Sequence, residues 1–402
     1  MSNLFAAARD HYKISLAGHS NKVHLTGHSH RLWSDRVIDA RKEYVDLSAN
    51  SSDHKWDKIF ERAQRFRLLV ASRVGITDPS RIGFDQNTYN LVYRVFSCFD
   101  RPKIVTTTSE FHSLTRGAAA LPNSDVTFVD VYDRKNMAQK IIDAITEGTN
   151  IVAVSTTFFD DGFSLPDVHA IVAKARSVGV VVILDAYHQY NIRPMDIDSF
   201  GLEGVFVVAG HYKYGGAGEG AAWISVPSVG TYNPRYTGWF AHFEALDQAR
   251  YPRPIHYDRG GIGFLGATMD YSGIFGAVAA LDLFDSLGWD VSYLAQNNIR
   301  QVGHLIDALS SLSEEGGLPV NTRILATYKQ GGGPDAFGPF LALDVGSSER
   351  ARRVCTRLAS LSEPVLVDSR GNNLRVGPGE YNTDEELDKG MQAIYRVLKE
   401  IV

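Results

Sequence analysis

The sequence predicts an α/β protein: a three-layer α/β/α large domain with a mostly parallel sheet, joined to a smaller α+β domain. The first observation is that short β-branched apolar runs alternate with longer helix-like stretches between about residues 55 and 226. Runs that are apolar throughout suit strands buried on both faces, and strands that alternate with helices form parallel sheets between helical layers. The second observation is that this pattern stops near residue 226 and a different alternation follows after about residue 290.

The elements of the large domain follow in order along the chain. Residues 55–76 begin it, with apolar residues at helical spacing. Helices are also expected within 134–148 and 165–179, each of which ends at or near a glycine, as helix C-termini often do. The expected strands lie within 103–108, 126–131, 150–156, 180–187, 204–210 and 221–226.

The pattern changes in the C-terminal part of the chain. Residues 227–262 are rich in Tyr, Pro, Gly and His and predict a long loop or insertion, whereas 271–289 predict a buried helix. Later helices alternate with strands expected within 340–345, 365–369 and 373–378. We therefore predict a large domain of residues 55–285 that carries the functional site, and a small domain formed by 1–54 and 286–402.

Composition limits the classes of function. The net charge of -5 argues against nucleic acid or an anionic membrane as the main partner. No apolar run reaches the roughly 18 residues needed to cross a bilayer, and the first residues lack a secretion signal, so we expect a cytoplasmic protein. Cys98 and Cys355 form no CxxC pair, and His24, His28 and His30 have no matching carboxylate cluster, so no metal site is predicted.

The stretch HYKYGGAGEG, residues 211–220, holds a glycine run that could be mistaken for a dinucleotide-binding fingerprint. Such a fingerprint must follow a strand and open a helix, because the pyrophosphate sits at the helix N-terminus. Here Gly216, Gly218 and Gly220 are followed by AAWISV, which predicts a strand. A nucleotide-dependent α/β enzyme therefore stays an alternative, but the spacing does not favour it.

Two charged residues stand where predicted strands end. Lys213 follows the strand expected within 204–210, and Asp185 ends the strand expected within 180–187. In open α/β sheets ligands bind at the carboxyl ends of strands. A lysine there can form an imine with an aldehyde cofactor, and a buried aspartate suits a pyridinium nitrogen. The ordinary alternatives are a surface lysine and a helix-capping aspartate.

Together these motifs resemble the pyridoxal-phosphate site of fold-type I enzymes, in particular the class V aminotransferase group and its kynureninases. The resemblance rests on the DAYH segment after one strand and on HYKYGGAGEG after the next. TGWFAH, DQNTYNLV, SEFHSLTR and NLRVGPGEYNTDEELDKGMQAI are similar to further kynureninase segments. The resemblance implies a homodimer with pyridoxal 5'-phosphate as cofactor and an amino acid as substrate; the composition, as noted above, argues against a nucleic-acid or membrane partner.

The resemblance also implies a role for each matching residue. Lys213 would hold the cofactor as an internal aldimine and then move the substrate's α-proton, with Tyr212 as a second acid. The other cofactor-binding residues would be Asp185 at the ring nitrogen, His188, Asn87, Thr88, Phe111 and His211, with Trp239 and Thr268 from the neighbouring subunit. Arg375 would grip the substrate carboxylate, and His28 and Ser29 would line the substrate pocket.

The match is incomplete around the substrate. Phe158 takes the place of the asparagine that the family places near the cofactor and substrate, Met269 replaces a proline, and Glu219 adds a charge. The resemblance implies kynureninase-like hydrolytic cleavage of a Cβ–Cγ bond. Transamination, β-elimination as in a C–S lyase, decarboxylation and epimerisation remain alternatives, as does a non-catalytic binding protein.

Overall fold

The computed structural model describes residues 8–132, 134–201, 203–245, 255–316 and 338–401. Its centre is a seven-stranded sheet in the order β2-β8-β7-β6-β5-β3-β4. Only β8 runs antiparallel to its neighbours, so the sheet is mostly parallel, as the sequence predicts. The strands are β2 Ile82–Asp85, β3 Lys103–Thr107, β4 Asp125–Val129, β5 Ile151–Ser155, β6 Val181–Asp185, β7 Val205–Gly210 and β8 Ala222–Ser225.

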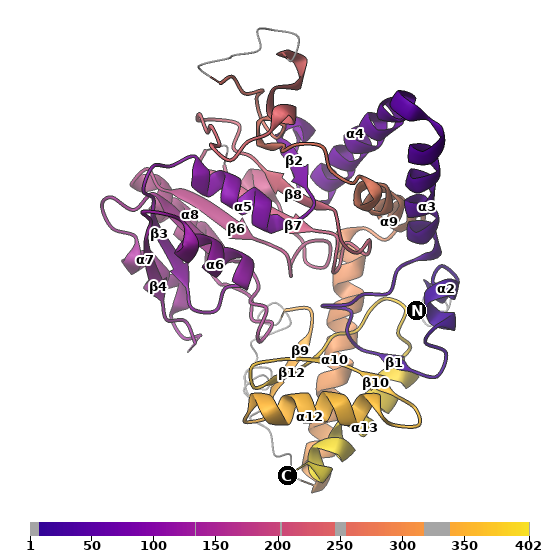
Figure 1. Ribbon diagram of the computed structural model, residues 1–402. Helices are drawn as coiled ribbons and strands as arrows, with labels where there is room; N and C mark the ends of the chain where they lie inside the picture. Colours follow the sequence, from indigo (N-terminus) through magenta and orange to yellow (C-terminus); the bar gives the residue numbers. More distant parts are fainter. Residues whose placement is uncertain (1–7, 133, 202, 246–254, 317–337, 402) are drawn as a thin grey trace.

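Two helical layers cover this sheet (Figure 1). One layer holds α5 (Thr88–Ser97) and α6 (His112–Ala120); the other holds α4 (Lys55–Arg73), α7 (Met137–Ala144), α8 (Val168–Ser177) and α9 (Ser272–Ser286). Successive side chains of a strand point to opposite faces of the sheet and pack alternately into the two cores. In β6, Val181 and Ile183 pack with α5 and α6, whereas Val182 and Leu184 pack with the other layer. Apolar residues at every position are therefore required, which explains the unbroken runs in the sequence.

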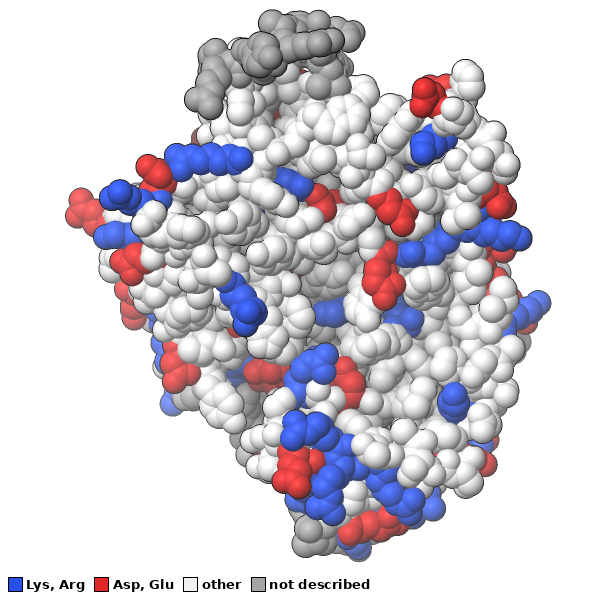
Figure 2. All heavy atoms as spheres, in the orientation of Figure 1, with Lys and Arg blue, Asp and Glu red and all other residues white. Residues whose placement is uncertain are grey.

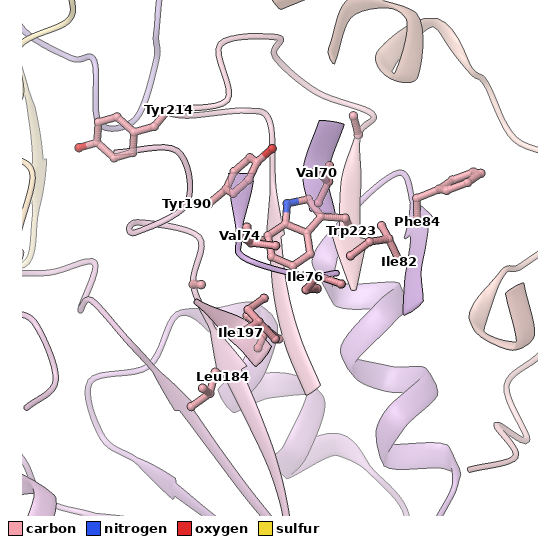
Figure 3. Packing of buried hydrophobic residues seen from close by; sticks show 14 of the residues in the cluster. Val70, Val74, Ile76, Ile82, Phe84, Leu184, Tyr190, Ile197, Tyr214 and Trp223 are labelled. Carbon is pink, nitrogen blue, oxygen red and sulfur yellow. The ribbon is translucent and has the colours of Figure 1, made fainter. Parts of the chain in front are cut away.

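The larger core is built around Trp223 of β8, which is fully buried (Figure 3). Its ring meets the ring of Tyr190 edge-on, with centroids 5.1 Å apart. Val70 and Val74, from the end of α4 and just beyond it, belong to the same core. This packing fixes β8 and the chain that leads into it, and that chain is the glycine-rich loop after β7.

The small domain is formed by both ends of the chain. β1 (Val23–His24) pairs in parallel with β10 (Val365–Leu366), and an antiparallel sheet has the order β11-β12-β9. Its core joins apolar residues near β1 to those of the C-terminal helices. The remaining elements here are β9 Leu341–Asp344, β11 Asp368–Arg370, β12 Asn373–Val376, α10 Val291–Gly316, α12 Ser348–Ala359 and α13 Asp384–Glu400.

The N-terminal segment contacts both domains. Val23 and Leu25 belong to the small core, whereas Val37 and Ala40 of α3 (Asp35–Asn50) belong to the large one, where α3 lies along α9. Short α2 (Lys13–Ala17) precedes β1. The domain boundary predicted at residue 55 stays a prediction. In the structure, α3 packs with the large domain, whereas β1, which precedes it, packs with the small one.

The segment 227–262 contains little regular structure where it is described. It holds one irregular 3-10 segment, η4 (Trp239–Ala245), and the start of η5 (Ile262–Phe264); residues 246–254 lie outside the described part. The other short 3-10 helices are η1 Ser52–His54, η2 Pro79–Arg81 and η3 Ile197–Phe200.

Charged side chains of both signs are spread over the visible face, with Lys and Arg most concentrated over the lower part, around α12 (Figure 2). Arg352, Arg353 and Arg357 are exposed residues of α12. Within the described residues, the structure holds no helix with the length and apolar character needed to cross a membrane.

Candidate active site

The carboxyl ends of β5, β6 and β7 meet at one edge of the sheet, because the three strands are parallel neighbours. A cavity of about 260 Å³ opens there. The predicted residues in its wall are Ser29, Asn87, Thr88, Phe111, Asp185, His188, Tyr212, Lys213 and Arg375. Nine predicted residues, two singled out by their place at strand ends and seven by the family resemblance, therefore meet in one cavity.

Lys213 lies three residues beyond β7 and points into this cavity. Its Nζ lies 2.6 Å from Nε2 of His188, 4.7 Å from the ring centre of Tyr187 and 5.7 Å from that of Phe111. Burial lowers the pKa of Lys213 to about 7, although the Asp185 carboxylate opposes the shift. A lysine whose pKa lies near physiological pH is partly uncharged there and can act as a nucleophile and as a base. An ordinary surface lysine stays protonated and cannot.

Asp185 is the last residue of β6 and is buried. Its carboxylate accepts a hydrogen bond from the backbone N–H of Tyr187 at 2.9 Å. Burial raises its pKa, and Lys213 opposes the shift. Among the described residues no cation lies within ion-pair distance of this carboxylate. A buried carboxylate that faces a cavity without a cationic partner is ready to receive one from a ligand.

His188 supports Lys213 from the segment that follows β6. It is buried, and burial, together with the nearby positive charge of Lys213, moves its pKa well below the ordinary value. The imidazole is therefore neutral, so that Nε2 accepts from the Lys213 ammonium when the lysine is protonated. The buried Nδ1 atom has no hydrogen-bond partner in the described part of the chain.

The N-terminus of α5 forms another part of the cavity wall. Asn87 is its N-cap, and its side chain accepts from the backbone N–H of Asn90 at 3.0 Å. Thr88 begins the helix and is buried. The free N–H groups and the positive end of a helix dipole attract anions, phosphate in particular.

Arg375 reaches the cavity from β12 of the small domain. Its Nε and Nη2 donate to the two carboxylate oxygens of Asp368 at 2.8 and 2.5 Å, and Nη1 donates to the carbonyl of Phe159 at 2.5 Å. Glu380 and Asp384, which follow Arg375 closely in the sequence, pair elsewhere: Glu380 with Arg31 and Asp384 with Arg300. Asp368 also accepts from His28 Nε2 at 3.0 Å.

Four of the predicted site residues do not line the cavity. His211 is fully buried and bonds with the Tyr190 hydroxyl at 3.0 Å, so it does not reach a phosphate at the cavity. His28 is fully buried behind the wall, stacked on Phe340. Trp239 and Thr268 lie in the exposed loop region, outside this cavity.

The expectation that Phe158 faces the cofactor is wrong. Its ring is fully buried, with the Arg134 guanidinium 4.1 Å from the ring centre. Thr157 and Phe159 line the cavity instead. Side chains alternate in direction along an extended chain, so an alignment shifted by one residue reverses which side chain faces the site.

Glycine is required in the run 215–220 for two reasons: the backbone conformation and the lack of space for a side chain. Gly216, Gly218 and Gly220 all have positive φ values, of 73, 73 and 91°. A side chain at Gly218 would collide with the ring of Trp33. The loop then enters β8, not a helix. These glycines therefore fold the chain that presents Lys213 and do not form a dinucleotide cradle.

Several cavity residues were missed from the sequence: His30, Ser113, Ser155, Thr157, Phe159, Tyr187 and Arg370. Ser155 ends β5, and Tyr187 lies two residues beyond Asp185, so their position at strand ends was a usable signal. Arg370 ends the short strand β11, which the sequence analysis did not separate from β10, and no sequence signal indicated a functional role for it.

The family model named Aminotransferase class-V matches residues 32–317, which is more than half of the chain. The chain belongs to the class V aminotransferase family. It is a pyridoxal-phosphate-dependent enzyme with the fold-type I architecture. The wall of the cavity fits this cofactor: a near-neutral lysine, a buried carboxylate without a cation, and a helix N-terminus for phosphate face one space.

Three curated relatives show how broad this class V family is. An uncharacterized aminotransferase, YcbU of Bacillus subtilis (strain 168), is 22% identical over 90% of both chains. A cysteine desulfurase of Pectobacterium atrosepticum is 26% identical over 63% of this chain and 60% of its own. A kynureninase of Pseudomonas fluorescens is 26% identical over 46% of each chain.

Among solved structures, the C–S lyase C-DES, with glycine covalently linked to its pyridoxal-phosphate cofactor, superposes with a TM-score of 0.78. It is 18% identical, and the match covers 95% of this chain and 98% of that one. At this identity the likeness shows the class V fold and leaves the reaction open.

Proposed function

We propose that this enzyme breaks the bond between Cβ of an amino acid and the next atom of its side chain. The observation that carries the proposal is that two groups suited to proton transfer, Lys213 and Tyr212, line one cavity with an arginine, Arg375, suited to a carboxylate. The names of the cysteine desulfurase, the kynureninase and the C–S lyase fit reactions at such a bond, which supports the choice.

Pyridoxal phosphate, when bound, supplies an aldehyde that condenses with amines and a ring that stabilises negative charge at the substrate's Cα. We propose that Lys213 holds it, that Asp185 pairs with its ring nitrogen, and that Phe111 contacts its face. The α5 N-terminus, with Asn87 and Thr88, would receive the phosphate.

The chain's own residues would then divide the proton transfers. Arg375 orients the substrate by its α-carboxylate, since a guanidinium fork suits that group. Lys213 Nζ, with its pKa near 7, takes the proton from Cα and can return it. Burial raises the pKa of the Tyr212 hydroxyl, so this group keeps its proton at neutral pH and serves as an acid beside Lys213.

Desulfuration by a cysteine nucleophile of this chain is not supported by the geometry. The sequence contains two cysteines, Cys98 and Cys355, and neither lines the cavity. Burial raises the pKa of Cys98 to about 12 and also raises that of Cys355. Both remain thiols at neutral pH and are poor nucleophiles.

Kynureninase-like hydrolysis of a Cβ–Cγ bond is the finer candidate within this proposal. The matching segment TGWFAH and the kynureninase relative favour it. Trp239 of the segment TGWFAH would then act in the cavity of the partner subunit. Under this candidate L-kynurenine gives anthranilate and alanine.

The test is product analysis by mass spectrometry after the cofactor-loaded enzyme is mixed with L-kynurenine, L-cystine or L-aspartate. Cleavage at Cβ releases alanine or pyruvate together with the side-chain fragment. Lys213→Ala abolishes turnover, whereas Lys42→Ala, which changes an exposed lysine of α3, does not. A keto acid that retains the intact side chain would instead establish transamination and overturn the proposal.

A further inference from the structure

The hairpin of β11 and β12 places three charged residues on one face. Asp368 lies opposite Arg375, and Arg370 lies opposite Asn373. Side chains two positions apart in a strand share a face, so Arg370 extends from the same side of β11 as Asp368. Gly371, with a φ of 52°, makes the turn directly after Arg370. The short turn thus fixes Arg370 at the end of the hairpin, where it lines the cavity.

Arg375 and Asp368 compensate each other's charge. The ion pair is bidentate, and both side chains are largely buried. A guanidinium has five N–H donors, and Arg375 uses one for each of its three recorded bonds, two to Asp368 and one to Phe159. Two N–H groups have no partner among the described residues and remain for a ligand. Arg375 therefore keeps the capacity to bind one carboxylate, and every amino acid has one at Cα.

Arg370 lines the same cavity with its charge uncompensated. Within the part of the chain that the structure describes, its side chain makes one hydrogen bond, from Nη1 to the carbonyl of Ser369 at 2.8 Å. Within the described ranges, no carboxylate lies within ion-pair distance of it. After Arg375 has bound the substrate's α-carboxylate, a second cation still faces the cavity.

The size of the cavity limits what this second cation can meet. Its volume of about 260 Å³ must hold the cofactor as well as the substrate. Pockets for small organic ligands usually have volumes of roughly 300–1,000 Å³. The remaining space suits a short side chain. Ser29, His30 and Thr157 add polar groups to the wall.

We propose that Arg370 binds an anionic group at the end of a short side chain, so that the substrate is a small acidic amino acid and not L-kynurenine, the candidate that sequence similarity alone favours. This inference rests on the proposed function, because it assumes that Arg375 takes the α-carboxylate. It gives the hairpin a selective role: Arg375 recognises what all amino acids share, and Arg370 recognises the acid group that only some carry.

The test uses two acids that lack the amino group and therefore cannot react with the cofactor. Propanoate carries one carboxylate and succinate carries two. Titration calorimetry of the cofactor-loaded protein should show roughly tenfold tighter binding of succinate, the gain of one charge-assisted pair. Arg370→Ala should lower succinate affinity to the level of propanoate and leave propanoate binding unchanged. Arg353→Ala, on the exposed face of α12, should change neither.

Other outcomes overturn the inference. Equal binding of both acids to the unaltered protein would show that no second anion is recognised. An equal loss of both acids in Arg370→Ala would assign Arg370 to the α-carboxylate. Failure of the proposed function is recognised separately: product analysis would then give a keto acid that retains the intact side chain, and the titrations with succinate and propanoate would still report on Arg370.

Discussion

At the scale of single residues, the proton on Lys213 decides when the site can react. Burial lowers the pKa of this lysine to about 7 from an ordinary value of 10.5, so the neutral amine predominates above that pH. We expect the rate at which cofactor-free protein takes up pyridoxal phosphate to rise through about pH 7 and to level off above about pH 8. Stopped-flow absorbance across this range measures it. A rate that keeps rising toward pH 10 would mean that the lysine is not perturbed.

Asp368 acts on the substrate through Arg375, which makes it a positioning residue. Asp368→Asn keeps the size of the side chain but loses the negative charge. The amide can no longer accept from both Nε and Nη2 of Arg375, as the two carboxylate oxygens do. We expect KM for the amino-acid substrate to rise roughly tenfold, with kcat changed less than about threefold, because binding geometry and not proton transfer is lost. Steady-state kinetics measure both values.

The control for Asp368 is Asp388→Asn, which removes an exposed carboxylate from a pair with His304. It should leave KM and kcat as they are. A fall in kcat with unchanged KM in Asp368→Asn would place Asp368 in the chemical step and contradict a positioning role.

The sequence located part of the site because strand ends are readable. Asp185 and Lys213 each follow an unbroken apolar run, and parallel strands bring such ends together. The direction in which a single side chain points could not be predicted from the sequence. Phe158 is buried in the core, whereas Thr157 and Phe159 line the cavity. Arg370 was missed because its importance depends on a cross-strand register that only the folded hairpin sets.

At the scale of elements, the loop after β7 depends on backbone conformations that only glycine adopts easily. Gly218 has a φ of 73°, and a Cβ there would collide with the ring of Trp33. We expect Gly218→Ala to destabilise the cofactor-free protein by about 1 kcal/mol for the left-handed conformation and by at least about 2 kcal/mol more for the collision. Urea unfolding measures the loss.

Gly179 provides the matched control for this loop. It has a φ of 72° in the turn between α8 and β6, and a Cβ there would meet nothing within 4 Å. Gly179→Ala should therefore cost only the conformational part, about 1 kcal/mol. Equal losses in the two variants would show that the contact with Trp33 relaxes freely and that the glycine at 218 serves conformation alone.

The elements themselves were largely predictable, and the exceptions have physical reasons. Residues 103–108, 150–156 and 180–187 contain β3, β5 and β6, since strands buried on both faces need unbroken apolar runs. The expected strand within 365–369 divides into β10 and β11, which belong to different sheets. A split of this kind depends on which partners the chain meets, and local composition does not encode it.

At the scale of the whole molecule, an exposed aromatic cluster predicts contact with a second copy. Trp239 is 42% exposed, and Phe243 and Phe60 are each 38% exposed. The three rings lie together, with centroids 5.5 Å apart for Trp239 and Phe243 and 5.4 Å for Phe60 and Phe243. Large exposed aromatic groups mark interaction surfaces. The family resemblance places Trp239 at the cavity of the neighbouring subunit, and both observations favour a homodimer.

Subunit mixing tests whether each cavity is built from two chains. If Lys213 of one subunit works with Trp239 of the other, a heterodimer of Lys213→Ala and Trp239→Ala subunits has one cavity with both changes and one cavity with neither. We expect two variants with little activity to regain about a quarter of the unaltered activity after equal mixing and subunit exchange, because half of the dimers are mixed and each has one intact site. Mixing Lys213→Ala with Asp185→Ala is the control: both residues lie in the same chain's cavity, so no site is restored. Activity that stays at the level of the separate variants, although light scattering shows exchanged dimers, would place Trp239 in its own subunit's site or outside any site.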